Sequence, residues 1–306
     1  MVRRPAPLPE GLTPLFTVGQ GIEQGMSHGR LRRGDLVAPT SGVRTARGGG
    51  PALDALLARC QAFALALPEP WAYSHTTAAR LLGLPLATPW TDREPLHVIR
   101  PTNLAMVRRR GTVHHRGLER RRVVTRQGLP VIAPTDTWCD LAGSLSLTER
   151  VVLADATVNT WSGVPLDQLI TAVARRDGER GVRALREALA LVRTRSRSRT
   201  ESLIRLALAA AGLPEPELNA DIHDAQGGWV ACSDFVWRRQ RVLAEYDGDH
   251  HREQRQWRRD HIVRADLIAE GWRVHVFTAT DLGRPAALHR RVAALATDLG
   301  VVPTSA

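Results

Sequence analysis

The sequence predicts a mixed α+β or α/β protein built from more than one domain. Its 306 residues are about twice the length expected of a single domain. With 43% apolar and 24% charged residues, the composition is that of a chain that can bury a core, and it excludes a mainly disordered one. After residue 200 the apolar residues recur first with helical spacing and then with period two, which predicts the order α-β-β-β-α-β.

The cysteine content and the hydropathy of the sequence predict a protein of a reducing compartment. Cys60, Cys139 and Cys232 are too few and too scattered for a disulfide framework or a Cys-x-x-Cys zinc site. The N-terminus lacks an apolar leader, and no later stretch approaches the roughly 20 apolar residues that cross a bilayer. We therefore expect a cytoplasmic protein without a membrane partner.

The charge indicates an anionic partner. The net charge is +11, and all 42 basic residues are arginines, whose planar donors suit phosphate and guanine. Residues 1–200 hold 29 arginines against 16 acidic residues, whereas residues 201–306 hold 13 against 15. A GC-rich genome could explain arginine without lysine, but it would not explain this asymmetry. We expect the first two-thirds of the chain to bind DNA.

Residues 1–50 are typical of a small winged helix-turn-helix domain. A helix is expected over 15–24, a turn over 25–27, and a second helix over 28–36 that Ser27 caps. Two strands over 36–39 and 42–44 would form the wing. The second helix carries the candidate DNA contacts Arg30, Arg32 and Arg33. The alternative is an ordinary helical hairpin, because glycines 19, 21 and 25 weaken the first helix.

Residues 51–192 predict a mixed α/β region. An apolar helix over 52–67 and an amphipathic stretch over 175–192 enclose short β-rich pieces at 97–99 and 111–115. A cluster of arginines here would track phosphates, and its candidate DNA contacts are Arg108, Arg109 and Arg110. His114 and His115 point to opposite sides of a strand and are expected to be structural. The alternating basic and hydroxylic residues 193–200 predict a linker or an exposed helix start, with a domain boundary near 197.

Residues 201–306 contain the candidate chemistry. Strands are expected over 218–222, 229–237 and 241–247, followed by a helix over 255–270 and a strand over 272–277. Alternation places Leu243, Glu245 and Asp247 on one face of the third strand. If residues 238–241 form the hairpin loop, Asp234 lies opposite Glu245. Like charges that face each other across a sheet are destabilising, so a cation should lie between them.

A hard divalent ion is the simplest such cation. Mg²⁺ or Mn²⁺ takes carboxylate oxygens, here those of Asp234 and Glu245, and keeps positions for water and phosphate. Such an ion can polarise a phosphodiester and orient the attacking water. The alternative is that Asp247 and Gly248 are only a turn and that Glu245 pairs with an arginine such as Arg205, Arg258 or Arg259.

Residues 198–283 resemble a known group. The resemblance rests on Glu201, Asp234-Phe235, Glu245-Tyr246-Asp247-Gly248, His251, Asp260, Arg264, Leu267 and Gly271-Trp272. This pattern is similar to the very-short-patch-repair-like branch of the PD-(D/E)XK nuclease superfamily. The resemblance implies a restriction-endonuclease-like αβββαβ core, with Glu201, Asp234 and Glu245 around the metal and Asp247 and His250 or His251 nearby.

Two departures from that pattern bear on activity. Ser233 stands where the superfamily has proline, and Asp247 stands where it has lysine. Asp247 cannot act as a cation, so either a histidine or an arginine substitutes for the lysine or activity is lost. His251 is a candidate general acid or base, because its unperturbed pKa lies near 6.5.

Residues 12–160 resemble a second group. Residues 74–85 (SHTTAARLLGLP) and 128–142 (GLPVIAPTDTWCDLA) are similar to AbiEi-type antitoxin and transcriptional-regulator proteins. The resemblance implies operator binding by an N-terminal winged helix and, as a partner, a cognate toxin.

Two functions follow from these patterns. The first is a divalent-metal-dependent DNA endonuclease whose N-terminal region binds the duplex. The second is a non-catalytic DNA-binding regulator, or a type IV antitoxin-like protein, that carries a degenerate nuclease fold. Neither function calls for a small-molecule substrate.

Overall fold

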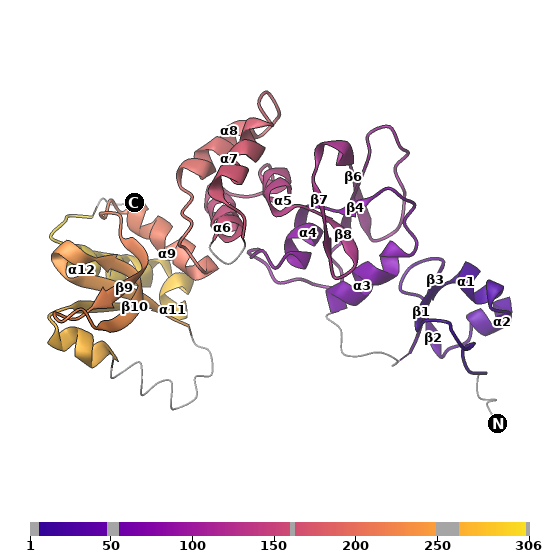
Figure 1. Ribbon diagram of the computed structural model, residues 1–306, viewed down its shortest axis with the longest axis horizontal. Coiled ribbons are helices and arrows are strands. Elements are labelled where there is room, and N and C mark those ends of the chain that lie inside the picture. The colour runs from indigo at the N-terminus through magenta and orange to yellow at the C-terminus, as the bar shows by residue number, and fades with distance from the viewer. Residues whose placement is uncertain (1–5, 48–54, 160–162, 249–262, 304–306) are drawn as a thin grey trace. The chain divides into compact units, whose positions relative to one another are not determined.

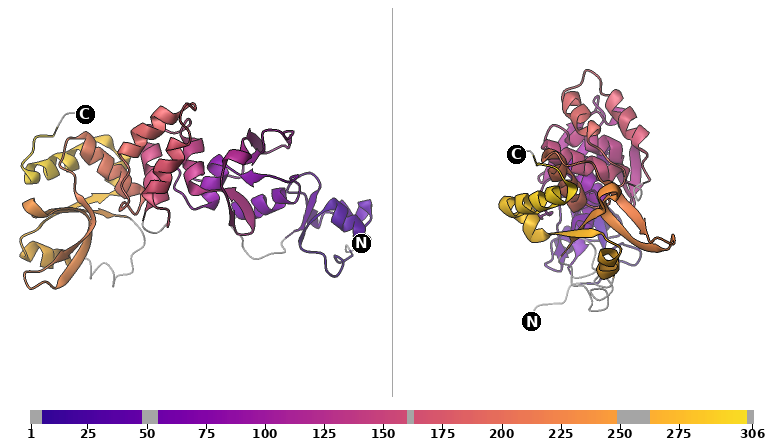
Figure 2. Two further views of the ribbon diagram at one scale, coloured as in Figure 1. Left: turned by 45° about the horizontal axis from the view of Figure 1, so that its top comes forward. Right: turned by 90° about the vertical axis from the view of Figure 1, so that its left-hand side faces the viewer.

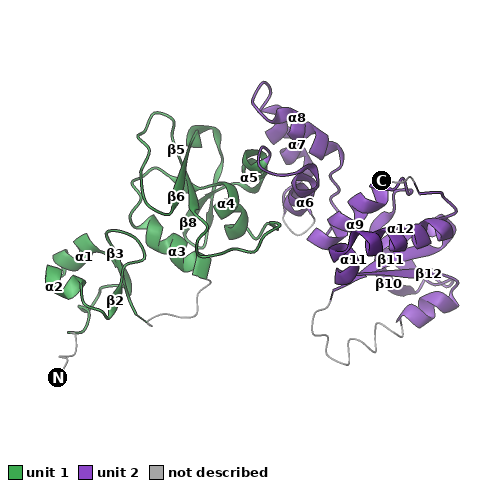
Figure 3. Cartoon of the chain, turned by 180° about the vertical axis from the view of Figure 1, so that it is seen from behind, with its two compact units in different colours: residues 1–141 green, residues 142–306 purple. Residues whose placement is uncertain are grey.

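The structure, a computed structural model, describes residues 6–47, 55–159, 163–248 and 263–303 (Figure 1). It is a mixed α+β protein with three β-sheets among the described residues. The chain divides into two compact units, Met1–Leu141 and Ala142–Ala306 (Figure 3). None of the helices in these ranges has the length and apolar character that a bilayer crossing requires.

Unit 1 begins with a small α+β region. Its elements are β1 (Leu15–Thr17), α1 (Val18–Glu23), α2 (His28–Leu31), β2 (Leu36–Val37) and β3 (Val43–Ala46). The three strands form an antiparallel sheet in the order β1-β3-β2. Ser27 caps α2 as predicted, since its Oγ accepts a 3.2 Å hydrogen bond from the Arg30 backbone.

This region differs from the prediction in two ways. Leu15–Thr17 is a strand, because it pairs with β3, and Thr17 caps a helix that starts only at Val18. The second helix ends at Leu31 instead of continuing to residue 36, so Arg32 and Arg33 lie beyond it. Phe16, Met26, Leu31 and Leu36 form the small core that fixes this arrangement.

The rest of unit 1 is a five-stranded sheet with helices. Its elements are α3 (Ala55–Ala64), β4 (Ala72–Tyr73), α4 (His75–Leu81), β5 (Leu96–Arg100), β6 (Thr112–Arg116), a 3₁₀ turn (Leu118–Arg120), β7 (Val123–Arg126), β8 (Leu129–Ile132) and α5 (Pro134–Leu141). The strand order is β6-β5-β4-β8-β7, with β5 parallel to β6 and β4 parallel to β8. One apolar core joins α3 to the central strands, and it includes Phe63, Tyr73, Val98 and Val131.

Unit 2 opens with helices. These are α6 (Leu147–Val158), α7 (Leu166–Ala174), α8 (Val182–Ala190) and α9 (Arg199–Ala210). The amphipathic stretch predicted over 175–192 is helical only in α8. Gly178 and Gly181 have φ of 76° and 93°, a left-handed conformation that interrupts a helix, and so the chain turns before α8 begins.

The rest of unit 2 is built on a four-stranded sheet. Its strands are β9 (Glu217–His223), β10 (Trp229–Trp237), β11 (Val242–Asp247) and β12 (Arg273–Thr278), followed by α11 (Ala279–Gly283) and α12 (Pro285–Leu299). The order β12-β11-β10-β9 is antiparallel except that β11 and β12 are parallel. With α9 before the sheet and helical residues 263–269 between β11 and β12, the predicted order α-β-β-β-α-β is confirmed.

Helices cover both faces of this sheet (Figure 2). On one face, α9 and α12 pack on Phe235, Ala244 and Phe277. On the other face, Leu267 of the 263–269 helix packs among Val236 and Leu243. The sheet is therefore the centre of the C-terminal region, and its second face carries the acidic residues that the alternation predicts.

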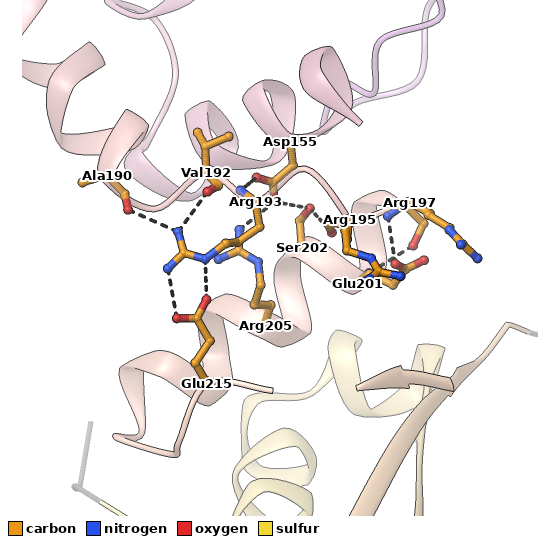
Figure 4. Close-up of polar contacts among 12 residues, drawn as sticks. Asp155, Ala190, Val192, Arg193, Arg195, Arg197, Glu201, Ser202, Arg205 and Glu215 are labelled. Atoms are coloured by element: carbon orange, nitrogen blue, oxygen red, sulfur yellow. Dashed lines mark hydrogen bonds and ion pairs between the residues drawn. The ribbon is translucent and has the colours of Figure 1, made fainter. Parts of the chain in front are cut away.

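The basic segment 193–200, predicted to be a linker or a helix start, leads into α9, and side-chain contacts hold it on both sides (Figure 4). The Arg193 backbone N–H donates a 2.8 Å hydrogen bond to Asp155 of α6, and its guanidinium pairs with Glu215. Ser196 is buried against Ser202, 2.8 Å between the hydroxyl oxygens. The segment thus lies within unit 2, and helix α9 begins at Arg199 with Ser198 as its cap.

Candidate active site

A pocket of about 290 Å³ opens on the face of the sheet where β10 and β11 meet. Asp234 and Glu245 line it from these two strands, and Arg264 lines it from the 263–269 helix. The pairing Phe235↔Ala244 is the register predicted from the 238–241 turn, so the next pair outward is Asp234 and Glu245. The register explains why two carboxylates share this pocket.

Asp234 is the most strongly perturbed acid of the pocket. Its Oδ2 accepts a 2.8 Å hydrogen bond from the backbone N–H of Tyr246. The pKa of Asp234 is raised to about 6, mainly because the side chain is buried. The charges of Glu201 and Glu245 contribute to this rise, and the Tyr246 hydrogen bond opposes it. A carboxyl group with this pKa changes between its protonated and charged forms when the pH varies slightly below neutrality. Many catalytic acids have pKa values that are shifted in this way.

Glu245 and Asp247 share one cation. Arg264 Nε lies 3.5 Å from Glu245 Oε2, and Arg264 Nη2 lies 3.5 Å from Asp247 Oδ2. These separations are at the long end of hydrogen bonding. The other oxygen, Glu245 Oε1, accepts a 2.8 Å hydrogen bond from the Ser233 hydroxyl. Ser233, which stands in the proline position of the resembled family, thus orients one of the two predicted metal ligands.

Glu201 lies at the start of α9 and is 8% exposed. Its Oε2 accepts hydrogen bonds from the Arg197 backbone, at 2.9 Å, and from the Asn219 side chain, at 2.7 Å. Its charge reaches Asp234, as the pKa of Asp234 shows. The structure therefore brings Glu201, Asp234 and Glu245 into electrostatic contact. His251, the candidate acid or base, lies outside the described residues, and so do Arg258 and Arg259.

The acidic side chains do not converge as a set of three. Among the residues that the structure describes, the only group of three or more His, Cys, Asp or Glu whose ligand atoms all lie within 4.8 Å of one another consists of histidines. The acidic pocket instead offers two carboxylates on neighbouring strands. One or two carboxylates with several waters is the coordination that Mg²⁺ usually has in proteins.

The predicted DNA-contacting arginines fall into two classes. Arg32, Arg33, Arg108 and Arg110 are exposed. Arg30 forms a bidentate pair with Asp35, at 3.0 and 2.7 Å, and Arg109 donates to Thr40 Oγ1, Ser41 O and Ala66 O. Arg30 and Arg109 therefore differ from the expectation, because their guanidinium groups are committed to contacts inside the protein.

A cluster of histidines in unit 1 was not predicted from the sequence. It consists of His75 at the start of α4, His97 on β5 and His115 on β6, and one ring nitrogen from each lies within 4.8 Å of the other two. Burial lowers the pKa of His97 and lowers that of His115 to about 3, where the neighbouring imidazoles add to the effect. Both rings are therefore neutral at physiological pH.

Comparison with known proteins gives relatives without a described function. Two uncharacterized proteins of Mycobacterium tuberculosis, from strains CDC 1551 and H37Rv, are each 32% identical to this chain over 163 residues. The match covers 53% of this chain and 59% of each relative. No protein-family model matches the chain, and no solved structure matches it.

Proposed function

We propose that residues 201–306 form a divalent-metal-dependent DNA endonuclease domain with a restriction-endonuclease-like core, and that the basic region upstream, including a winged-helix-like N-terminus, binds DNA. The observation that carries this proposal is the placement of Asp234 and Glu245, on paired strands and in one pocket with an arginine. The element order and the parallel pairing of β11 with β12 agree with it.

The side chains of the pocket suit a hard divalent cation. Asp234 has its pKa raised because its carboxylate lies half-buried near two other carboxylates, an arrangement that a cation relieves. Asp234 and Glu245 offer carboxylate oxygens to this pocket, and oxygen is what Mg²⁺ and Mn²⁺ prefer. Asp234 and Glu245 would hold the ion. When bound, such an ion would polarise the scissile phosphodiester and lower the pKa of a water.

The neighbouring residues position these acids. The Tyr246 N–H fixes Asp234, and the Ser233 hydroxyl fixes Oε1 of Glu245. Asn219 and the Arg197 backbone hold Glu201 close enough to keep a negative potential on Asp234. Side chains that are held in place lose little entropy on binding a substrate or a metal.

Arg264 supplies the positive charge that Asp247 cannot. Its guanidinium lines the same pocket and lies 3.5 Å from both Glu245 and Asp247. A guanidinium can donate two hydrogen bonds to a phosphate and stabilise the charge that develops on it. In this proposal Arg264 takes the place of the lysine that the resembled family has at position 247.

DNA binding is assigned to the exposed arginines upstream. Arg32, Arg33, Arg108 and Arg110 are exposed cations in a region whose arginines exceed its acids by 13. Sequence-independent affinity for DNA comes mainly from such contacts with phosphate.

The test is cleavage of supercoiled plasmid by the full chain with Mg²⁺ or Mn²⁺ at pH 7.5. Wild type should nick the plasmid and chelator should stop it, while Asp234→Asn and Glu245→Gln should lose at least about a hundredfold in rate. Glu217→Gln is the matched control, because Glu217 is an exposed acid of the same sheet that pairs with Arg238. Equal cleavage by wild type and both site variants would exclude the proposal.

A second function is favoured by the contacts of Arg264. This guanidinium already lies between Glu245 and Asp247, so part of the acidic cluster is neutralised without a metal. That arrangement suits a non-catalytic DNA-binding regulator, with or without a toxin partner. A wild-type chain that shifts DNA in a gel but never cleaves it, with either metal, would favour this second function.

A further inference from the structure

We propose that His75, His97 and His115 form a binding site for a transition-metal ion of the zinc type, separate from the acidic pocket. The three side chains come from three elements, and one ring nitrogen of each lies within 4.8 Å of the other two. Each side chain is partly exposed, so an ion can reach the cluster from solvent. The site does not depend on the nuclease proposal.

Backbone pairing brings the three histidines together. Strands β5 and β6 are parallel neighbours in which His97 pairs with Val113 and Ile99 pairs with His115, so the two histidines are two positions apart along the ladder. Strand β4 pairs with β5 on the other side, and the Ser74 N–H donates a 3.0 Å hydrogen bond to His97 O. This bond places His75, the next residue, beside His97.

The rings are close enough for a common ion. His97 Nδ1 lies 2.9 Å from His115 Nε2, and the His75 and His115 rings stack with their centroids 3.6 Å apart. Two nitrogens bound to one tetrahedral zinc are about 3.3 Å apart, because each Zn–N bond is about 2.0–2.1 Å. To bind a zinc ion, the stacked imidazole rings must therefore move slightly apart and rotate about their side-chain bonds. The backbone need not move.

The donor set selects the class of metal. Three imidazoles without a carboxylate ligand suit Zn²⁺, Cu²⁺, Ni²⁺ or Co²⁺ and do not suit Mg²⁺ or Ca²⁺. The acids that interact electrostatically with His97 and His115 are already paired, Glu94 with Arg80 and Asp140 with Arg121, each at 2.8 Å. Three protein ligands leave one position of a tetrahedral ion for water or another small ligand.

A stack of hydrogen-bonded histidines without an ion is the competing explanation, and metal binding tells the two apart. The full chain is freed of metal with a chelator and titrated with ZnCl₂ by calorimetry. We expect one zinc per chain, and about tenfold or greater weakening in His97→Gln and in His115→Gln. A wild type that binds clearly less than one zinc per chain, or variants that bind as wild type does, would overturn the proposal.

Two controls separate this site from others. His114→Gln removes the neighbouring imidazole on β6, which instead bonds Thr112 Oγ1 at 2.8 Å, and should leave zinc affinity unchanged. The double variant Asp234→Asn/Glu245→Gln should also bind zinc as wild type does, whether or not the acidic pocket cleaves DNA. If the double variant instead loses the zinc, the ion belongs to the acidic pocket and the histidine proposal fails.

A spectroscopic measurement on wild type covers the case in which a histidine variant does not fold. Co²⁺ bound by three imidazoles and water gives visible d–d bands and lacks the near-ultraviolet band of a cobalt–thiolate bond. We expect those bands at one Co²⁺ per chain and their loss on addition of one Zn²⁺, with excess Mg²⁺ having no effect. Featureless spectra, or bands that Mg²⁺ removes, would contradict the site.

Discussion

The backbone N–H of Tyr246 donates a 2.8 Å hydrogen bond to Oδ2 of Asp234, across the hairpin that joins β10 to β11. This bond holds the carboxylate in the pocket and partly offsets the cost of burying it. The offset is incomplete, because the pKa of Asp234 is still about 6, well above its ordinary value of 3.8. The site therefore has a charge whose presence opposes folding.

Replacing Asp234 by asparagine should stabilise the chain in a pH-dependent way. The folded state binds the Asp234 proton more tightly than the unfolded state does. The contribution of Asp234 to the free energy of unfolding therefore falls as the pH rises from about 4 to about 6, and it is constant above that. We expect Asp234→Asn to exceed wild type by about 1–2 kcal/mol in free energy of unfolding at pH 8, after allowance for solvent around a half-buried group. At pH 3.5 the two should be equal.

Urea unfolding of both proteins from pH 3.5 to 8 measures this difference. Asparagine keeps an oxygen that can accept the Tyr246 hydrogen bond, so the comparison isolates the charge. A constant difference between the two proteins across this range would show that Asp234 does not titrate as its surroundings require.

Arg264 provides a second prediction, on catalysis. Arg264→Ala should lower the rate of plasmid nicking at saturating Mn²⁺ by about a hundredfold or more, because the substrate phosphate loses its cationic partner. Arg264→Lys should recover part of the rate, since it restores a charge but not the planar pair of donors. Single-turnover rates at saturating metal are the measurement. If alanine and lysine variants cleave as fast as wild type, Arg264 only neutralises Glu245 and Asp247.

The exposed arginines give a third prediction, on DNA affinity. Arg32→Ala, Arg33→Ala, Arg108→Ala or Arg110→Ala should each weaken binding to any duplex and reduce the slope of log K against log salt by about 0.9 per lost phosphate contact. Gel-shift titrations at several NaCl concentrations measure both quantities. Arg44→Ala is not a suitable control, because its guanidinium holds Leu31 O.

Arg109→Ala is expected to act differently from its neighbours. It removes the hydrogen bonds to Thr40, Ser41 and Ala66, so it should lower stability by about 1–3 kcal/mol. Its effect on the salt slope should be small. Thermal unfolding, measured together with the same gel shifts, distinguishes a structural role of Arg109 from a contact with phosphate. An unchanged melting temperature with a reduced salt slope would show that Arg109 contacts phosphate.

The buried pair of Asp155 and Arg205 gives a fourth prediction. Their side chains are 1% and 5% exposed, with Oδ2 and Nη2 2.6 Å apart. Burial raises the pKa of Asp155 against the lowering by Arg205, so removing either partner leaves a costly charge. Asp155→Ala should lose about 3–5 kcal/mol of stability, and Asp155→Leu/Arg205→Met should lose much less.

The comparison pair for this test is on the surface. Asp177 and Arg186 are 74% and 55% exposed, so Asp177→Asn should leave the free energy of unfolding close to that of wild type. Denaturant midpoints of the three variants decide the matter. A double variant as unstable as Asp155→Ala would mean that the loss comes from packing or from the Arg193 N–H and Ser202 hydroxyl that Asp155 also binds, rather than from an unpaired charge.

The sequence was most informative where one structural rule acts alone. Strands β9 to β12 and the Asp234–Glu245 register follow from alternation and from a short turn, both of which are local. The contacts of Arg30 and Arg109 could not be predicted in this way, because an arginine's partner depends on tertiary structure. The same applies to Arg264, which the family pattern named without a role.

The histidine cluster was missed for a related reason. Alternation correctly separates His114 from His115, but it says nothing about which strands lie beside β6. The relevant signals in the sequence were His75 at the start of a helix and His97 and His115 within strands. Only the parallel pairing of β5 with β6 and the antiparallel pairing of β4 with β5 bring these three positions together.

The interlocked segment around Asp155, Arg193 and Ser202 sets limits on how this protein can be cut for experiments (Figure 4). A fragment that starts at residue 198 would expose the Arg205 guanidinium and discard its counterion, although residues 201–306 look self-contained in the sequence. A shortened expression clone should start near Ala142 instead, where the compact unit itself begins. For the same reason, a gene fusion that transfers the four-stranded sheet of unit 2 to another protein would have to include α6, which carries Asp155.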